Sequence, residues 1–365
     1  MLKQFFMTIL KAFFGSVAAV IGLVGTFVIM IVAIAVVFAS QVDLDEQLTT
    51  KKLSPSFVAG DVSSNNKLLE IPISGIILGE RQESDFFQAL GGYDLTYGYD
   101  IKEQLKQASE MEDIKGVLLN IQSPGGTIFG TKAITDGITQ YRQATSKPVV
   151  AYVGSIAASG GYWVASSADQ IVADLGTTLG SIGVIAGPFK YYDQVTSEDG
   201  GAFMGGVVTQ GGVETTYITA GSSKDLGNPY RRLTTREIST LQTGVNNAYE
   251  YFVTDVGKSR YLDPEFIKDE VGALIYDEQQ AKELHLIDKV GSKQDAEQEL
   301  ANLAVLKDDY QVVRDSGSNS LFGDLGVMMS RSFGNPSLNS SSNSGACVLA
   351  TLPLAYHGDV SVLCR

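Results

Sequence analysis

The hydrophobic pattern predicts short strands that alternate with amphipathic helices through the middle of the chain. The apolar run 116–121, bounded by turn residues, predicts a strand buried on both faces. Other strands are predicted at 67–78, 148–153, 171–173, 179–185, 213–220 and 310–314, and helices at 100–111, 131–144, 263–270, 277–284 and 294–306. Alternating strands and helices of this kind predict an α/β domain with helices packed on sheets.

One longer helix has a clear predicted start. Thr234 and Glu237 have the spacing of a capping box, in which each side chain bonds the other residue's backbone N–H. The apolar residues that follow share one helical face: Ile238, Leu241, Val245, Phe252 and Val256. This pattern predicts a helix that buries one stripe along its length.

The N-terminal region predicts a membrane anchor. Residues 12–39 carry no charge and are long enough to span a bilayer, which needs about 20 apolar residues. Lys3 and Lys11 precede the run and acidic residues follow it, so the chain after residue 40 is expected outside the cytoplasm. A cleaved signal peptide is the alternative, but its apolar region is typically about 7–15 residues long. An uncleaved single-pass anchor is the favoured interpretation.

The pattern divides the chain into four parts. Residues 1–40 are the cytoplasmic tip and anchor, 41–66 a polar tether, 67–314 the folded domain, and 315–365 a Ser/Asn-rich linker and C-terminal tail. In that tail, Cys347 and Cys364 can pair as a disulfide outside the cytoplasm. Alternatively, the small apolar residues 346–354 resemble a peptidase product and can occupy the chain's own groove, or the tail has no role.

Charge and composition argue against several classes of partner and site. The net charge of −14 makes nucleic acid and anionic lipid surfaces poor partners. The two cysteines form no ligand cluster with histidine, so a metal site is not expected. Histidine occurs only at positions 285 and 357, so a catalytic serine in this chain is expected to use another base.

Ser159 is the candidate nucleophile. It lies between small residues where an apolar strand turns into a helix, a place that leaves room for its hydroxyl. A second glycine turn, at 123–126, also follows a buried strand. If the two strands are neighbours, the N–H groups of Gly126 and Gly160 can converge on an oxyanion. The alternative is that both segments are only tight turns.

A lysine is the candidate base, as in Ser-Lys enzymes. To accept a proton a lysine must be neutral, although its ordinary pKa is about 10.4, and burial supplies the required shift. Lys224 differs from the other lysines because it lies between Ser223 and Leu226-Gly227, at the end of a strand-like segment. Asp225 must then point away from it. The alternative is a solvated surface lysine.

These motifs together resemble the signal peptide peptidase A (protease IV) family. The anchor, SPGG at 123–126, ASGGYW at 158–163, TLGSIGV at 178–184 and SSKD at 222–225 occur in family order, and the resemblance covers residues 67–314. It implies Ser-Lys peptidases of the ClpP/crotonase-like fold in a bacterial-type inner membrane. Ser159 would be the nucleophile, Lys224 the base, Ser181 a hydrogen-bond partner of the lysine amine, and Gly126 and Gly160 the oxyanion hole.

The resemblance also implies features beyond the dyad. Family members form homo-oligomeric rings in which the lysine can come from a different subunit than the serine. The family usually has glycine where His285 stands, which indicates a helix end. The glycine-rich stretch 196–213 is a departure from the family pattern.

The resulting prediction is a membrane-anchored serine endopeptidase with an extracytoplasmic domain. It would cleave hydrophobic peptides such as released signal peptides, in a groove near Tyr162 and Trp163, without a metal or organic cofactor. Two alternatives are a relative of the crotonases that handles acyl-CoA, and a catalytically silent membrane scaffold of the same fold.

Overall fold

A computed structural model describes residues 52–81, 94–193 and 216–316. Elsewhere it describes only residues 26, 197–198, 207–208 and 212, and the backbone of 354–356. The chain divides into two units, Met1–Lys52 and Leu53–Arg365. Apart from Thr26, the predicted anchor lies outside the described residues, as do Cys347 and Cys364. Within the described ranges, no helix is both long enough and apolar enough to cross a membrane.

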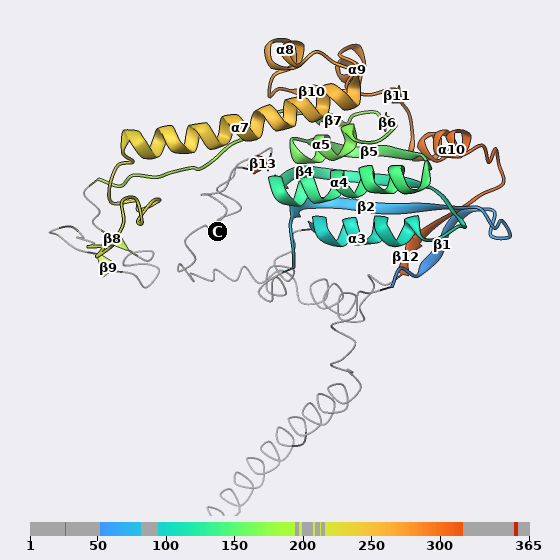
Figure 1. The fold of residues 1–365 in the computed structure, drawn as a ribbon, viewed down its shortest axis with the longest axis horizontal. Coiled ribbons are helices and arrows are strands. Elements are labelled where there is room, and N and C mark those ends of the chain that lie inside the picture. The colour runs from blue at the N-terminus through green and yellow to red at the C-terminus, as the bar shows by residue number, and fades with distance from the viewer. Residues whose placement is uncertain are drawn as a thin grey trace, which may run out of the picture. The chain divides into compact units, whose positions relative to one another are not determined.

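The second unit is built on a largely parallel sheet (Figure 1). Its strands follow the order β1 (Pro55–Gly60), β12 (Gln311–Asp315), β2 (Lys67–Leu78), β4 (Ile114–Thr127), β5 (Val149–Ala158), β6 (Gln170–Ala173) and β11 (Lys289–Val290). Short strands extend it: β3 (Leu95–Tyr97) beside β2, β7 (Thr178–Gly180) beside β5, β10 (Ile275–Asp277) beside β7, and β13 (Leu354–Tyr356) beside β4. From β12 to β11 every pairing is parallel.

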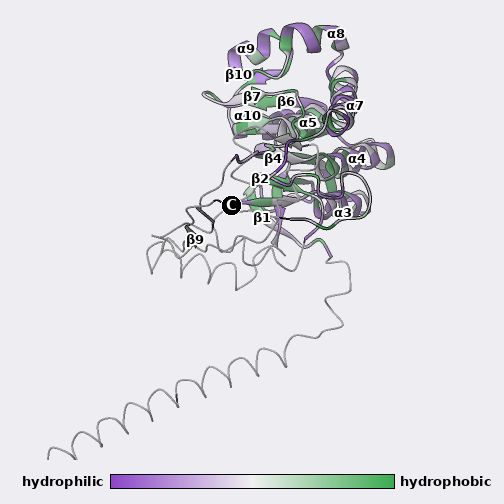
Figure 2. Ribbon diagram, turned by 90° about the vertical axis from the view of Figure 1, so that its left-hand side faces the viewer, coloured by the Kyte–Doolittle hydropathy of each residue, from purple (hydrophilic) through white to green (hydrophobic). Residues whose placement is uncertain are grey.

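Helices cover both faces of this sheet. One face is covered by α3 (Gly98–Ser109), α4 (Ile128–Thr145), α5 (Gly160–Ser166) and α7 (Thr235–Arg260). The other face is covered by α10 (Lys293–Leu303). The remaining elements are α8 (Pro264–Phe266), the π-helix η2 (Ile267–Val271), α9 (Glu278–Glu283) and the short strands β8 (Ser197–Glu198) and β9 (Val207–Val208). Figure 2 shows that the outward faces of α3, α4 and α7 are largely hydrophilic.

Alternate residues of each strand point to opposite faces of the sheet, so the strands contribute to a core on each face. Along β5, Val149, Ala151 and Val153 join the core under α3, α4 and α5, whereas Val150 and Tyr152 join the core under α10. Strands β4 and β5 are therefore buried on both faces, as their continuous apolar runs predict. The α/β prediction is confirmed, and the strand at 67–78 and the helices near 100–111 and 131–144 are confirmed with it.

Several boundaries differ from the prediction. Residues 55–60, inside the predicted tether, form β1, because they pair with β12 at the edge of the sheet. The strand predicted at 179–185 ends at Gly180, and residues 216–220 form no strand. The segment 123–126 is not a terminal turn: β4 continues through it to Thr127, with irregular pairing on both edges.

The long helix α7 begins with the predicted capping box between Thr234 and Glu237. Its apolar stripe, however, is buried only in the second half, at Phe252 and Val256. Ile238, in the first turn, is 53% exposed. The reason is that α5 packs against α7 near Phe252, whereas the first turn contacts the preceding loop through the buried Glu237 and leaves Ile238 outside.

Candidate active site

Ser159 occupies the sharp turn between β5 and α5. Its backbone has φ 53° and ψ −119°, a left-handed conformation that non-glycine residues rarely adopt. A strained serine at a strand-to-helix turn is the geometry that presents a nucleophile in hydrolases. The hydroxyl donates a hydrogen bond to the Gly183 carbonyl at 3.3 Å, and the residue has no exposed surface.

The two glycine segments lie side by side. A Cβ on Gly161 would stand 2.4 Å from the carbonyl oxygen of Ser123, so only glycine fits there without a shift. Gly126 is held even closer to β2, because its Cβ would stand 2.0 Å from the Ile77 oxygen. The structure thus brings the segments of both predicted oxyanion donors, Gly126 and Gly160, next to Ser159.

Ser181 also lies beside the candidate nucleophile. Strand β7 pairs with the end of β5, and the Ser159 N–H donates to the Gly180 carbonyl at 2.8 Å. Ser181 follows at once with φ 53° and is 7% exposed, and its N–H donates to the Leu274 carbonyl at 2.6 Å. The segment 178–183 is thereby fixed against the turn that holds Ser159.

Lys224 is not brought to Ser159 within the single chain. It is exposed, and its neighbour Asp225 bonds Arg231, which also bonds Glu237 in the first turn of α7. Glu237 lies about 22 Å along the helix axis from Phe252, at about 1.5 Å per residue. Figure 1 shows the segment before α7 at the far end of that helix from α5. The candidate base Lys224 therefore lies away from Ser159 within this chain.

Asp225, the residue after Lys224, forms a salt bridge with Arg231. Its carboxylate receives two hydrogen bonds from Arg231, at 2.7 and 2.8 Å. These bonds lower the pKa of Asp225 to about 2, so it remains ionised and paired with the guanidinium. Hydrogen bonds from Arg231 likewise lower the pKa of Glu237. The three side chains hold the loop around Lys224 on the first turn of α7.

Known proteins resemble this chain over a long stretch that includes Ser159. Residues 141–307, which include Ser159, Ser181 and Lys224, match peptidase family S49. A putative protease of Methanocaldococcus jannaschii is 31% identical over 244 residues, which are 67% of this chain and 73% of that protein. A putative signal peptide peptidase SppA of Enterococcus faecium is 31% identical over 64% of this chain and 62% of its own length. Protease 4 of Haemophilus influenzae is 28% identical over 68% of this chain.

The chain belongs to peptidase family S49, the signal peptide peptidase A or protease IV family. The match to Protease 4 covers only 36% of that longer protein, and the match to the Enterococcus protein covers somewhat less than two thirds of it. The family membership makes the chain a peptidase.

The prediction that Tyr162 and Trp163 line a substrate groove is wrong. Both side chains are fully buried. The Tyr162 hydroxyl donates to the Leu286 carbonyl at 2.9 Å, and burial raises the pKa of Tyr162 well above its ordinary value. The small residues at 158–161 let α5 pack tightly, which turns both aromatic side chains into the core and away from the turn.

Trp163 instead connects α5, the helix that follows Ser159, to α7. Its ring stacks on Phe252 with centroids 4.4 Å apart and planes 8° apart. Its indole N–H donates to Asp255 at 3.2 Å, and Asp255 also pairs with Lys132 of α4 at 3.4 Å. No local sequence signal distinguishes Asp255 from other surface carboxylates, so sequence reasoning missed this contact.

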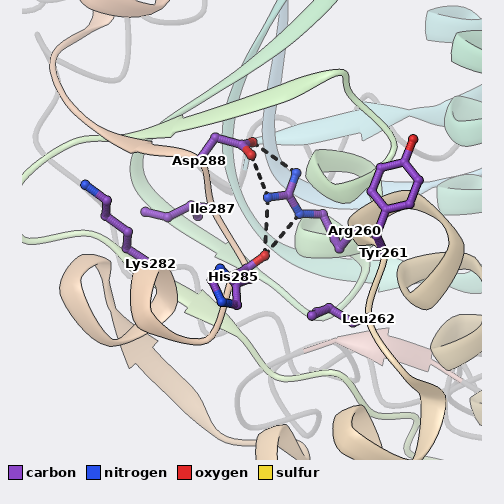
Figure 3. A pocket seen from close by; sticks show the side chains of 7 residues that line it. All are labelled: Arg260, Tyr261, Leu262, Lys282, His285, Ile287 and Asp288. Carbon is purple, nitrogen blue, oxygen red and sulfur yellow. Dashed lines mark hydrogen bonds and ion pairs between the residues drawn. The ribbon is translucent and has the colours of Figure 1, made fainter.

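His285 lies at a helix end, as the family glycine at this position implies. It follows α9 with φ 58°, and its N–H donates to the Lys282 carbonyl at 3.1 Å. Figure 3 shows Arg260 reaching the His285 carbonyl and, through two hydrogen bonds, Asp288. The residues drawn in Figure 3 line a pocket between the end of α7 and the start of β11. None of the predicted catalytic residues lines this pocket.

Proposed function

We propose that this peptidase is a membrane-anchored Ser-Lys endopeptidase, with Ser159 as nucleophile and Lys224 as base. The observation that supports Ser159 as the nucleophile is its positive φ at the β5–α5 turn, next to the segments that hold Gly126, Gly160 and Ser181. The parallel sheet with helices on both faces supports the ClpP/crotonase-like fold that the resemblance implies. The apolar run 12–39 supports a single-pass anchor with the domain outside the cytoplasm.

The proposed chemistry is acyl transfer. The Ser159 oxygen attacks the peptide carbonyl carbon while its proton passes to the lysine amine. The N–H groups of Gly126 and Gly160 stabilise the negative charge that develops on the carbonyl oxygen. The C–N bond breaks as the leaving amine takes the proton back from the lysine. Water then hydrolyses the ester on Ser159 with the lysine again as base.

We further propose that Lys224 acts on Ser159 of a neighbouring copy. Within one chain the loop of Lys224 is held at the first turn of α7, about 22 Å from the part of that helix that packs on α5. Ile238, in the first turn of α7, is an exposed apolar side chain that a second copy can cover. Packing of that kind would also shield Lys224 from water, which a neutral lysine requires.

The substrates we propose are hydrophobic or unfolded peptides, such as signal peptides already released from secreted proteins. A relative is named a putative signal peptide peptidase, which supports this class. An acyl-CoA substrate is less well supported, because the family match is to peptidases.

Subunit mixing tests this mechanism. The detergent-solubilised full chain is assayed for cleavage of a hydrophobic peptide as wild type, Ser159→Ala and Lys224→Ala. Each variant alone is expected to lose activity by at least about 10³-fold, and mixed oligomers of the two variants are expected to regain part of it. A fluorophosphonate should label Ser159 in the wild type and not in Ser159→Ala.

Three outcomes would contradict the proposal. Full activity of Lys224→Ala would place the base elsewhere. Mixed oligomers without any recovery would mean that each copy uses its own lysine. A wild type that neither cleaves peptides nor reacts with the fluorophosphonate would favour the silent scaffold.

A further inference from the structure

Arg231 joins the loop that carries Lys224 to the first turn of α7. Its Nε and Nη2 atoms donate to the two carboxylate oxygens of Asp225 at 2.8 and 2.7 Å. Its Nη2 and Nη1 atoms donate to the two oxygens of Glu237 at 2.7 and 2.9 Å, and Nη1 also donates to the Arg232 carbonyl at 3.1 Å. A guanidinium has five N–H donors, and these five bonds use all of them.

The residues on both sides of Lys224 are bonded to this cluster, whose charged members are Asp225, Arg231 and Glu237. Asp225 follows the lysine and pairs with Arg231. Ser223 precedes the lysine, and hydrogen bonds from Arg231 and from the Ser223 side chain are among those that lower the pKa of Glu237. The lysine is therefore carried by a short segment that is tied to α7 before and after it.

Capping of α7 does not require the arginine. Thr234 and Glu237 already form the complete capping box, in which the carboxylate accepts from the Thr234 N–H at 2.7 Å. The Arg231 side chain is 30% exposed, and ion pairs in contact with solvent add little to stability. The main consequence of the extra bonds is geometric, because they fix the loop of Lys224 on the helix.

The helix α7 is in turn fixed on the helix that follows Ser159. Trp163 of α5 stacks on Phe252 in the second half of α7. One helix thus connects the loop of Lys224, at its first turn, to the packing of α5. Where the lysine of one copy serves the serine of another, a displaced loop would move the amine away from the nucleophile.

We propose that Arg231 is a positioning residue for the candidate base: it holds the loop of Lys224 on α7 and neutralises Asp225, the carboxylate next to the lysine. The proposal rests on the proposed function, because it takes Lys224 as the base of the peptidase. A carboxylate without its partner favours the protonated form of a nearby lysine, which cannot accept the proton of Ser159. Removal of the arginine should therefore impair catalysis in two separable ways, by releasing the loop and by leaving this negative charge unpaired.

The kinetics of Arg231 variants in the detergent-solubilised full chain test the positioning role. In Arg231→Gln we expect kcat for a hydrophobic peptide to fall about 10- to 100-fold, as a misplaced catalytic group does, while KM changes less than about twofold. Arg231→Lys keeps a positive charge but not the bidentate fork, so it should recover only part of the loss. The matched control is Arg236→Gln, which changes an exposed arginine in the first turn of α7 and should leave kcat unchanged.

The pH profile separates positioning from a merely structural role. In Arg231→Gln the pH of half-maximal kcat/KM is expected to rise by roughly half a unit or more, because the unpaired Asp225 carboxylate favours the protonated base. Adding Asp225→Asn removes that charge, so the double variant should return to the wild-type profile or below it while kcat stays low. An unchanged profile in Arg231→Gln would overturn the neutralisation of Asp225.

Hydrogen exchange reads the loop without depending on catalysis. In the Ser159→Ala background, exchange at residues 222–228 is expected to be roughly tenfold faster with Arg231→Gln and unchanged with Arg236→Gln. Exchange in β4 and β5 should stay as in the parent, which would show that the fold is intact. Unchanged exchange at 222–228 would mean that the arginine does not hold the loop, and would overturn the proposal even in a chain that cleaves nothing.

The outcomes separate this proposal from the proposed function. If Lys224→Ala is inactive and Arg231→Gln keeps the wild-type kcat, the positioning role is overturned and the dyad stands. If Lys224→Ala keeps full activity, the dyad itself fails. Faster exchange at 222–228 with an unchanged kcat would also overturn the positioning role, because the position of the loop would then not limit catalysis.

Discussion

Gly161 and Ser123 approach so closely that a Cβ on the glycine would stand 2.4 Å from the serine carbonyl oxygen. Gly161 is in the first turn of α5, and Ser123 is at the irregularity where β4 leaves β5. This approach fixes the helix of the candidate nucleophile against the segment of the predicted oxyanion donor Gly126. The relative position of these two parts is therefore set by backbone contact.

Gly161→Ala should disturb this geometry. The added methyl group must displace backbone, because the atom it meets is a carbonyl and not a flexible side chain. We expect a loss of about 1–3 kcal/mol in unfolding free energy and a larger proportional loss of kcat. Urea denaturation and peptide cleavage measure the two effects. The control is Gly244→Ala in α7, where a Cβ meets nothing within 4 Å and where alanine should stabilise by up to about 1 kcal/mol. Equal behaviour of the two variants would contradict the expectation.

Asp255→Ala should loosen the contact between α5 and α7. It leaves the indole N–H of Trp163 without its acceptor, at an expected cost of about 1–3 kcal/mol. Trp163 is the only tryptophan, so acrylamide quenching of its fluorescence reports the change directly. Lys132→Ala removes the half-exposed ion pair but keeps the indole acceptor, and should cost no more than about 1 kcal/mol. If the lysine variant cost as much as Asp255→Ala, the indole bond would not be the stabilising contact.

Glu70 should make stability depend on pH. Burial would raise its pKa, but hydrogen bonds from Lys293 and Asn120 and the charge of Arg314 outweigh burial and lower the pKa below the ordinary 4.5. The ionised group therefore stabilises the fold above about pH 4.5, and this contribution is lost as the pH falls through the lower folded pKa. Glu70→Gln should cost about 1–3 kcal/mol at pH 7 and progressively less in acid.

Urea denaturation of wild type and Glu70→Gln at pH 7 and below pH 4 checks this expectation. The exposed Glu112→Gln serves as the matched control, with an expected effect within about 0.5 kcal/mol at both pH values. A difference between wild type and Glu70→Gln that stays constant across the range would show that the carboxylate charge is not what stabilises the cluster.

His285→Gly should stabilise the chain by about 0.5–1 kcal/mol, because φ of 58° at a helix end favours glycine. Peptide cleavage should not change. His285→Ala removes the imidazole without relieving the backbone, so it should leave both activity and thermal stability nearly unchanged. Loss of cleavage in the alanine variant would give His285 a role beyond the helix end.

Much of the fold could be predicted because its signals are local. Continuous apolar runs between turn residues predicted β2, β4 and β5, and the Thr234–Glu237 spacing predicted the start of α7. Strand β1 was missed, since its residues are largely exposed and it is held as a strand by pairing with β12, at the other end of the domain sequence. The burial of α7 was overestimated for the same reason: periodicity marks an apolar face but does not say how far the partner extends.

The candidate site, like the fold, has some features that the local sequence predicts and others that depend on tertiary contacts. The sequence by itself determined the α/β class and the strand-to-helix turn at Ser159, because turn chemistry and strand burial depend on neighbouring residues. Only the tertiary structure decided that Tyr162 and Trp163 point into the core, that Lys224 lies far along α7 from Ser159, and that residues 354–356 pair beside Gly126. These relationships join distant parts of the chain, and local periodicity carries no information about which distant backbone will lie alongside.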